Sequence, residues 1–570
     1  MRRVLLVIAV SALGILPAVP ASARNSFTFY GSGYGHGLGM SQWGAYGLAQ
    51  DGWTHRRILR HFYSGTAVRQ DPRPPRSLRI GLTQDQSAVR LTAEAGPITI
   101  RVRDPKSGPL VGSIPEGRTW TVREVRDAYR VLNSRGRQVG GQDWGGSARD
   151  LFLTYVGAGA RVRSPDAGAV YNRGFIEFNL YDCAGRGCSM RMILRVAPQE
   201  YLYGLGEVPS SWPEAALRAQ AVAARTYAFK KAASGQHRGG CNCALYDSSL
   251  DQVYVGWVKE GGSFGRRWVR SVRQTDDQVV EYSGEVISAF YSSSDGGHTE
   301  NNENVWGGTP IPYLRGVCDP GDFTSANPSR VWDVTYSAAR VTDRLHGYTG
   351  NIGTVTGFSD VRRGVSGRII TVRVQGDSGS SVITGTAFRA GLGLRDDRVW
   401  VNRNMNVTGK IRATYDAANC RPGLPTTAEV SVPGGSRQRF EGGAIYRNAG
   451  SVTVWLRVRI NDEYVAAGGA TGRLGLPTSR AIHITRVSGC AAGCSRVAFD
   501  GGRIYWKSAA GANALWGRVL NEFLARNGVQ GSLGFPTSRV QEAIDGSASA
   551  TFEHGSISCP PPGSGDCSAG

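Results

Sequence analysis

A single glutamate in this chain is placed where it could do acid–base chemistry. Glu207 lies between two predicted helices, because Gly204 and Gly206 end the first helix and Pro209 precedes the second. Val208 comes before that proline and is expected to be extended. A carboxyl group in such a rigid, non-helical joint can point into a cleft and act as an acid. A glutamate in a joint is more often a solvated surface charge, and the residues alone leave both readings open.

Ten cysteines form a second set of reactive side chains. Their even number and close spacing predict five disulfides in an oxidising compartment. The pairs that are close in sequence are Cys183/Cys188, Cys490/Cys494 and Cys559/Cys567. His237, Cys241 and Cys243 could instead belong to a zinc site, since imidazole and thiolate bind zinc, but their spacing is not that of a standard finger. We favour disulfides, and we predict neither a metal nor a cofactor.

The residues before position 70 predict a strand, a glycine-rich turn and two helices. Residues 27–30 alternate as in a strand, and glycine recurs through 31–40. Ser41 is a typical N-cap for a helix that ends near Gln50, and Thr54 is typical of a second one. A dinucleotide-binding loop is excluded, because no glycine here has others at both +2 and +5.

The middle of the chain alternates between strand and helix patterns. Period-two alternation predicts strands at 77–135, 151–156, 175–181 and 191–196. A short helix is expected from 198 to about 205, and a longer one over 211–232. In the longer helix, Ser211 and Glu214 predict a capping box, and small apolar residues predict one apolar stripe. The fold class is α+β: a mixed, strand-rich catalytic domain with a few helices, followed by a repeat array.

Repeats begin near residue 421. Residues 472–479 recur as 531–538, and residues 440–446 recur as 499–505, with a weaker copy at Phe552. Units that cannot bury an apolar face alone should stack on their neighbours. This β- and loop-rich region has glycine turns and aromatic residues but no cluster of titratable groups, which indicates a repeat array and not a catalytic domain.

Charge and the first residues indicate an exported protein. The net charge is +21, with 60 arginines and six lysines, which favours a polyanionic partner. Arg2 and Arg3 precede an apolar run and a small-residue cleavage site, so residues 1–23 read as a signal peptide. No later stretch has 18 apolar residues, so no membrane span remains after cleavage. Export makes nucleic acid and nicotinamide cofactors unsuitable partners and favours an anionic cell wall.

Four sequence blocks resemble the stage II sporulation protein D / LytB amidase-enhancer family. They are residues 198–229, 246–256, 289–314 and 35–45. The resemblance covers about 27–415, which gives a domain at 24–420 with its Gly-His-Gly segment, 31–66, at the start. In many relatives that segment closes the domain, and chain ends that lie close together allow the permutation. Residues 421–570 resemble LGFP repeats, which occur in exported cell-wall proteins of actinobacteria.

The resemblance implies a secreted, wall-associated peptidoglycan lytic transglycosylase with Glu207 as its catalytic acid. It also implies glycan-binding residues, namely His36, Ser41, Gln42, Tyr201, Tyr203, Trp212, Tyr291, Ser292, Ser293 and His298. The three aromatic residues near Glu207 could equally be core, the serines a polar turn, and His36 a residue that only holds its loop. The expected partners are peptidoglycan glycan strands and, through the repeats, anionic wall polymers. The alternatives are a non-catalytic enhancer of a cell-wall amidase and a structural envelope protein.

Overall fold

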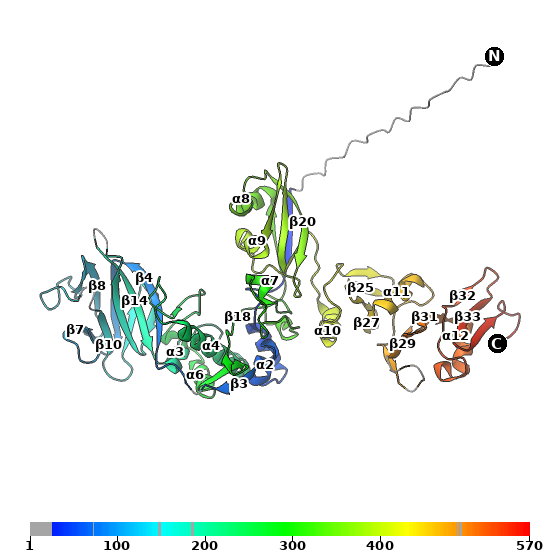
Figure 1. The fold of residues 1–570 in the computed structure, drawn as a ribbon, viewed down its shortest axis with the longest axis horizontal. Helices are drawn as coiled ribbons and strands as arrows, with labels where there is room; N and C mark the ends of the chain where they lie inside the picture. Colours follow the sequence, from blue (N-terminus) through cyan, green and yellow to red (C-terminus); the bar gives the residue numbers. More distant parts are fainter. Residues whose placement is uncertain are drawn as a thin grey trace, which may run out of the picture.

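The computed structural model describes residues 25–71, 73–145, 150–183, 187–485, 487, 490 and 493–570. The predicted signal peptide therefore lies outside the described residues. The chain is mixed α+β, as expected, and forms a row of lobes (Figure 1). Within the described ranges, no helix is both long enough and apolar enough to cross a membrane.

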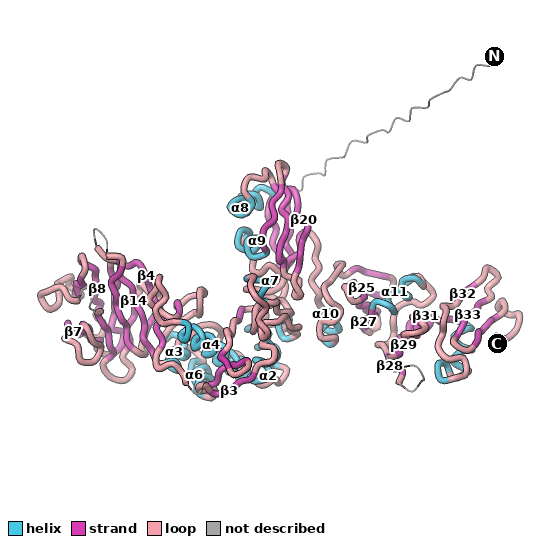
Figure 2. Tube along the Cα trace, viewed as in Figure 1, coloured by secondary structure: helices cyan, strands magenta, loops and turns pink. Residues whose placement is uncertain are grey.

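The first lobe is a sandwich of two antiparallel-rich sheets, and Figure 2 shows its strands packed side by side. One sheet has the order β15-β4-β14-β13-β10-β6-β7 and contains β4 (Leu78–Gln86), β6 (Ile98–Val102), β7 (Leu110–Ile114), β10 (Leu151–Tyr155), β13 (Phe175–Tyr181), β14 (Ser189–Val196) and β15 (Leu245–Tyr246). The other has the order β12-β11-β5-β8-β9 and contains β5 (Ala88–Ala95), β8 (Thr119–Val125), β9 (Ala128–Leu132), β11 (Arg161–Ser164) and β12 (Ala169–Tyr171). Alternate side chains of both sheets fill one apolar core, as the period-two pattern predicted.

A helical region follows the sandwich. It contains α1 (Gln42–Gln50), α2 (His55–Phe62), α3 (Pro198–Tyr203), α4 (Glu214–Ser234), α5 (Trp257–Gly261), α6 (Gly265–Arg273), β3 (Ala67–Gln70), β16 (Gln278–Tyr282) and β17 (Glu285–Val286). Ser41 caps α1 by accepting a hydrogen bond from the N–H of Gly44, and Thr54 caps α2 through Arg57. Both predicted caps are confirmed.

Helix α4 differs from its prediction in two respects. The capping box is wrong, because α4 begins at Glu214 with Pro213 as its N-cap and no side-chain cap. Ser211 lies outside the helix, and Glu214 instead pairs with Arg218 at 3.0 Å. The stripe of Leu217, Ala221, Ala224 and Ala228 is buried as expected, but burial extends well beyond it, since the helix packs against α1, α2, α6 and β16. Its many alanines have small side chains, so neighbouring helices and strands can pack closely against several faces of α4.

The third lobe joins the start of the described chain to residues far along it. Strand β1 (Ser26–Gly31) lies between β19 (Trp332–Ser337) and β23 (Val399–Val401), and Figure 1 shows it as a blue strand among green ones. The lobe also contains α8 (Ala338–Thr349), β20 (Val355–Arg363), β21 (Ile369–Gly376), β22 (Ser380–Thr384) and α9 (Gly385–Leu392). Below it, β2 (Met40–Ser41) pairs in parallel with β18 (Tyr291–Ser292), and α7 (Asn302–Trp306) follows.

The repeats form three four-stranded sheets after α10 (Gly409–Ala417). The first contains β24 (Val430–Val432), β25 (Gly435–Phe440), β26 (Gly443–Asn448) and β27 (Thr453–Arg457), followed by α11 (Val458–Ala466). The second contains β28 (Ile482–Ile484), β29 (Cys494–Phe499), β30 (Gly502–Lys507) and β31 (Gly511–Trp516), followed by α12 (Gly517–Ala525). The third contains β32 (Gln541–Glu542), β33 (Ala548–Phe552), β34 (Gly555–Cys559) and β35 (Ser568–Ala569). Tyr464 stacks on Phe499 and Phe523 stacks on Phe552, so neighbouring repeats share their cores.

Five disulfides link the ten cysteines, as predicted. The three pairs close in sequence are those expected. Cys241 is bonded to Cys243, which removes both thiolates of the alternative zinc site. The fifth bond, Cys318–Cys420, joins residues 102 positions apart and fixes the end of α10 against the segment before the third lobe.

Candidate functional site

Glu207 lies in the short segment between α3 and α4, and its carboxylate is held by three other parts of the chain. Oε1 accepts a hydrogen bond from the backbone N–H of Val253 at 2.7 Å. Oε2 accepts one from Nε2 of Gln42 at 3.3 Å, and the Tyr291 hydroxyl donates to the same carboxylate. The side chain is only partly buried. The carboxylate is thus fixed in direction, and the residue as a whole keeps partial exposure.

A second layer of hydrogen bonds orients Tyr291. Gln252 donates from Nε2 to the Tyr291 hydroxyl at 2.8 Å, and its Oε1 accepts from the Tyr201 hydroxyl at 3.1 Å. Tyr201 is fully buried and stacks on Tyr254, with ring centroids 5.3 Å apart. Tyr201 therefore positions the network from within the core and offers no face to a sugar.

Burial sets the electrostatics around Glu207. It raises the pKa of Glu207 above its ordinary value, and the hydrogen bonds to the carboxylate oppose that rise. Lys259, whose ammonium donates to the carbonyl of Val208, has its pKa lowered to about 8 by burial, while the charge of Glu207 raises it. A carboxyl group that keeps its proton to higher pH than usual is suited to general acid catalysis.

Two aromatic groups lie on the elements that hold this carboxylate. Trp43, Tyr46 and Trp212 form a triangle with ring centroids 4.7–5.2 Å apart, directly after Gln42. Trp43 and Tyr46 are partly exposed, so the triangle offers apolar faces of the kind that stack on sugar rings.

The second aromatic group begins at the glycine loop. The ring of His36 lies 5.1 Å from that of Trp306, which in turn lies 4.7 Å from Phe290. Burial lowers the pKa of His36 to about 3, which favours the neutral ring. Its Nδ1 accepts from the N–H of Leu38, and its other nitrogen bonds the backbone of Tyr291. His36 therefore connects its loop to the strand that carries Tyr291.

Comparison with known proteins shows which families parts of this chain resemble. Residues 187–282 match the family model SpoIID, described as "Stage II sporulation protein". The chain carries a SpoIID domain. The matched residues include Glu207, Gln252, Val253 and Lys259, whereas Gln42 and Tyr291 complete the site from outside that range. Residues 423–472 and 474–531 match the LGFP repeat model.

Similar proteins are known in bacilli. An amidase enhancer of Bacillus subtilis is 37% identical over 131 residues, which cover 23% of this chain and 16% of that protein. Stage II sporulation protein D of the same species is 29% identical over 157 residues, 26% of this chain and 45% of that protein. Its counterpart in Bacillus amyloliquefaciens is 27% identical over 221 residues, 37% of this chain and 62% of that protein. The chain thus matches less than two thirds of the length of each relative.

The fold brings part of the predicted residue set together, from inside and outside the matched range. Gln42 and Tyr291 contact the Glu207 carboxylate, and Tyr201 supports them from the core. Trp212 joins the first aromatic group, and His36 belongs to the second.

Other predicted residues lie in contacts of their own. The Ser41 hydroxyl caps α1 and donates to Asp322, and Tyr203 accepts a hydrogen bond from Arg273 at 3.2 Å. His298 donates from Nδ1 to the carbonyl of Thr299, and burial lowers its pKa to about 4. Ser293 contributes its backbone carbonyl, which accepts from Trp43, and Ser292 pairs with Ser41 through the β2–β18 ladder.

Several residues of the site were not predicted. Trp43 lies in the 35–45 block and Tyr46 directly follows it, and their three-residue spacing on a helix could have indicated a shared face. Gln252 and Val253 stood in the 246–256 block. Lys259 carried no sequence signal, because its place beside Val208 depends on α5 folding back onto the joint between α3 and α4.

Three carboxyl groups form a separate buried cluster next to Ser41. Asp295, Asp319 and Asp322 have oxygens within 4.8 Å of one another. Burial raises the pKa of all three, that of Asp295 to about 8, and Asp295 and Asp319 hydrogen bond to each other. Repulsion among the three carboxyl groups adds to the effect of burial on Asp295 and Asp319, so their titrations are coupled.

Proposed function

We propose that this chain is a secreted peptidoglycan lytic transglycosylase whose acid and base is Glu207, held at the wall by its LGFP repeats. The observation that supports this most is the Glu207 carboxyl group itself. Burial raises its pKa, it is oriented by Val253, Gln42 and Tyr291, and its residue keeps partial exposure. A single such carboxyl is enough for a cleavage in which water does not attack.

The proposed reaction uses Glu207 twice. Protonated Glu207 gives its proton to the leaving O4 as the C1–O4 glycosidic bond breaks, which leaves an oxocarbenium-like centre at C1 of the muramic acid. The C6 hydroxyl of the same sugar then bonds to C1, and its proton passes to the Glu207 carboxylate. The 1,6-anhydro ring forms, the acid is regenerated and the atoms balance without water. Between the two proton transfers the carboxylate is charged, and hydrogen bonds from Gln42 and Tyr291 stabilise it.

The resemblance to a protein named amidase enhancer favours a second candidate. In this function the same surface binds glycan without cutting it and stimulates a partner cell-wall amidase. The aromatic groups serve either function, because both require bound sugar.

Product analysis distinguishes the two functions. The mature protein alone is incubated with purified glycan strands, with and without stem peptides, and products are analysed by mass spectrometry. The transglycosylase proposal expects 1,6-anhydromuramic acid ends. Absence of these ends on every strand preparation, together with stimulation of an added amidase, would establish the enhancer instead.

Lys259 provides a test based on pH. Because protonated Glu207 is the active form, cleavage should decline as pH rises through its raised pKa. Lys259→Met removes a nearby positive charge that lowers this pKa. We therefore expect the alkaline limb of the pH–rate profile to move to higher pH. The control Lys231→Met removes an ammonium group that pairs with Asp251 at 3.2 Å and should leave the limb in place. An unmoved limb in Lys259→Met would contradict the assignment of Glu207 as the acid.

Charge should contribute to wall association. A net charge of +21 predicts that sedimentation with isolated cell walls falls as sodium chloride is raised, since exposed charges are screened over about 8–10 Å near physiological ionic strength. The bound fraction is measured between low salt and about 1 M, where screening shortens to about 3 Å. Binding that does not change across this range would argue against an electrostatic component.

A further inference from the structure

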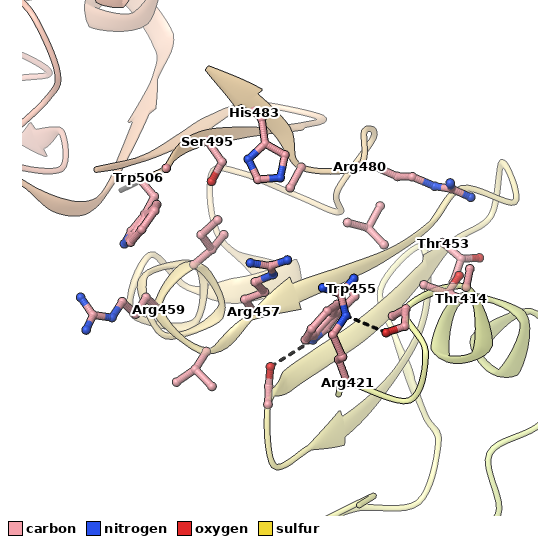
Figure 3. Close-up of a pocket in the computed structure, with 18 of the residues that line it drawn as sticks. Thr414, Arg421, Thr453, Trp455, Arg457, Arg459, Arg480, His483, Ser495 and Trp506 are labelled. Atoms are coloured by element: carbon pink, nitrogen blue, oxygen red, sulfur yellow. Dashed lines mark hydrogen bonds between the residues drawn. The ribbon is translucent and has the colours of Figure 1, made fainter. Parts of the chain in front are cut away.

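A hollow of about 620 Å³ lies between the first and second repeats (Figure 3). It is lined by β27 and the start of α11, by β28, β29 and β30, and by the end of α10. Trp455 and Trp506 line it from the two repeats, and both are partly exposed. The hollow belongs to the repeat array and is distinct from the Glu207 site.

The charged side chains around this hollow are all basic. Arg421, Arg457, Arg459, Arg480 and His483 line it, and no acidic residue does. Within the described ranges, none of the four arginines forms a salt bridge. The expectation that the repeats hold no cluster of titratable groups is therefore wrong here, because residues 421 to 483 are brought together only by folding.

Two of these arginines lie against an aromatic ring. The guanidinium carbon of Arg457 is 5.2 Å from the centroid of the Trp455 ring, and that of Arg421 is 5.9 Å away. Trp455 is fixed by a hydrogen bond from its Nε1 to the carbonyl of Gly442 at 3.0 Å. Figure 3 shows Trp455 beside Arg421 and Arg457 at one end of the hollow. A rigid ring with adjacent guanidinium groups can hold a planar anionic group and a sugar face together.

In the second repeat, the positions that correspond to this part of the hollow have hydrogen-bond partners within the protein. Gly443 pairs with Arg457 in the first repeat, as Gly502 pairs with Trp516 in the second, so Arg459 corresponds to Arg518. Trp516 donates to Glu542 at 2.8 Å, and Arg518 donates to backbone carbonyls of the third repeat. In the first repeat, the corresponding positions face the hollow, which is lined with arginine.

We propose that this hollow binds an acidic saccharide. The sugar face lies on Trp455 or Trp506, and its carboxylate or phosphate is bound by Arg457 and Arg421, the two guanidinium groups beside Trp455. The inference rests on the proposed wall association, for which it names the ligand class and the site. Carboxylate and phosphate share the planar or multidentate oxygen chemistry that guanidinium groups recognise, so the probes below separate them.

Binding is measured on the intact mature protein with three soluble probes. They are a galacturonic acid hexamer for carboxylate, a poly(glycerol phosphate) oligomer for phosphate, and maltohexaose as the neutral control. Calorimetry gives affinity and stoichiometry. We expect one site for at least one acidic probe, and binding of maltohexaose at least about tenfold weaker. Equal binding of the neutral probe, or no binding of either acidic probe, would overturn the proposal.

Matched variants test whether the acidic probe binds in this hollow. Arg457→Gln should weaken the acidic probe by about tenfold or more, as expected when a hydrogen bond to a charged group is lost. Arg447→Gln removes the same charge from an exposed position of the same repeat that does not line the hollow, and should change affinity less than about twofold. Trp455→Phe keeps an aromatic ring if larger changes disturb folding, and should also weaken binding. Equal effects of Arg457→Gln and Arg447→Gln would show binding to diffuse charge only.

Sedimentation separates this inference from the function it rests on. If Arg457→Gln loses the probe while wall binding stays unchanged, the site exists and does not serve as the wall tether. If the parent protein sediments with walls and binds neither acidic probe, wall association stands and the saccharide site is refuted.

Discussion

Glu207→Gln is expected to remove strand cleavage while leaving the fold and glycan binding intact. Glutamine keeps the size of the side chain and can still accept from the N–H of Val253, but it has no proton to transfer. Acid–base assistance is typically worth about 10²–10⁴-fold, and a sole acid that acts twice should lie at or beyond the upper end. The rate of 1,6-anhydromuramic acid formation measures the loss, and binding of uncut strands shows that the surface is preserved.

Two neighbouring glutamates are the controls for this variant. The Glu200 side chain is 37% exposed and lies 3.4 Å from Arg173, and Glu214 is 45% exposed beside Arg218. Exposed ion pairs of this kind contribute at most about 1 kcal/mol, so Glu200→Gln and Glu214→Gln should cleave like the parent. A parent-like rate in Glu207→Gln, with either control inactive, would refute the assignment.

Removal of the Cys318–Cys420 disulfide is expected to have the largest effect on stability. The bond closes a loop of about 100 residues, which corresponds to roughly 4.7 kcal/mol in the chain-entropy model. Both sulfurs are buried beside Ile411, Tyr415 and Phe440, where α10 packs against the first repeat. The double variant Cys318→Ala/Cys420→Ala should therefore unfold at lower urea concentration, and the contact between α10 and that repeat should become susceptible to proteolysis.

The matched control is the Cys559–Cys567 bond. Its cysteines are only eight positions apart, so its removal should cost less than about 3 kcal/mol. Equal shifts in the urea midpoint for the two double variants would contradict the loop-length explanation.

Helix starts and strands were predictable because they depend on residues that are close together in the sequence. Ser41 and Thr54 cap α1 and α2 through hydrogen bonds to backbone N–H groups three residues away. The period-two strands required only an apolar face. The capping box of α4 failed because Pro213 keeps its own segment extended, and burial of the helix exceeds the predicted stripe because tertiary contacts cover most of its sides.

The site was predictable only in its centre. The glycines and Pro209 placed Glu207 in a joint, and the family resemblance added Gln42 and Tyr291. Ser41 had two possible uses, and the helix cap accounts for its hydroxyl. Lys259 and the arginine-lined hollow depend on segments that meet only in three dimensions, and no spacing in the sequence encodes such meetings.

The position of β1 determines when this protein can finish folding. Its neighbours, β19 and β23, follow it by about 300 and 370 residues, so pairing must wait until almost the whole first 401 residues are available. At a synthesis rate of about 5–20 residues per second, that interval is roughly 20–70 s, during which Phe27 and Phe29 have no partner strand. Contacts this distant in sequence also make folding slow. Gln42 follows β2 directly and Tyr291 lies in β18, so the Glu207 carboxylate gains these two hydrogen-bond partners only after both segments are in place.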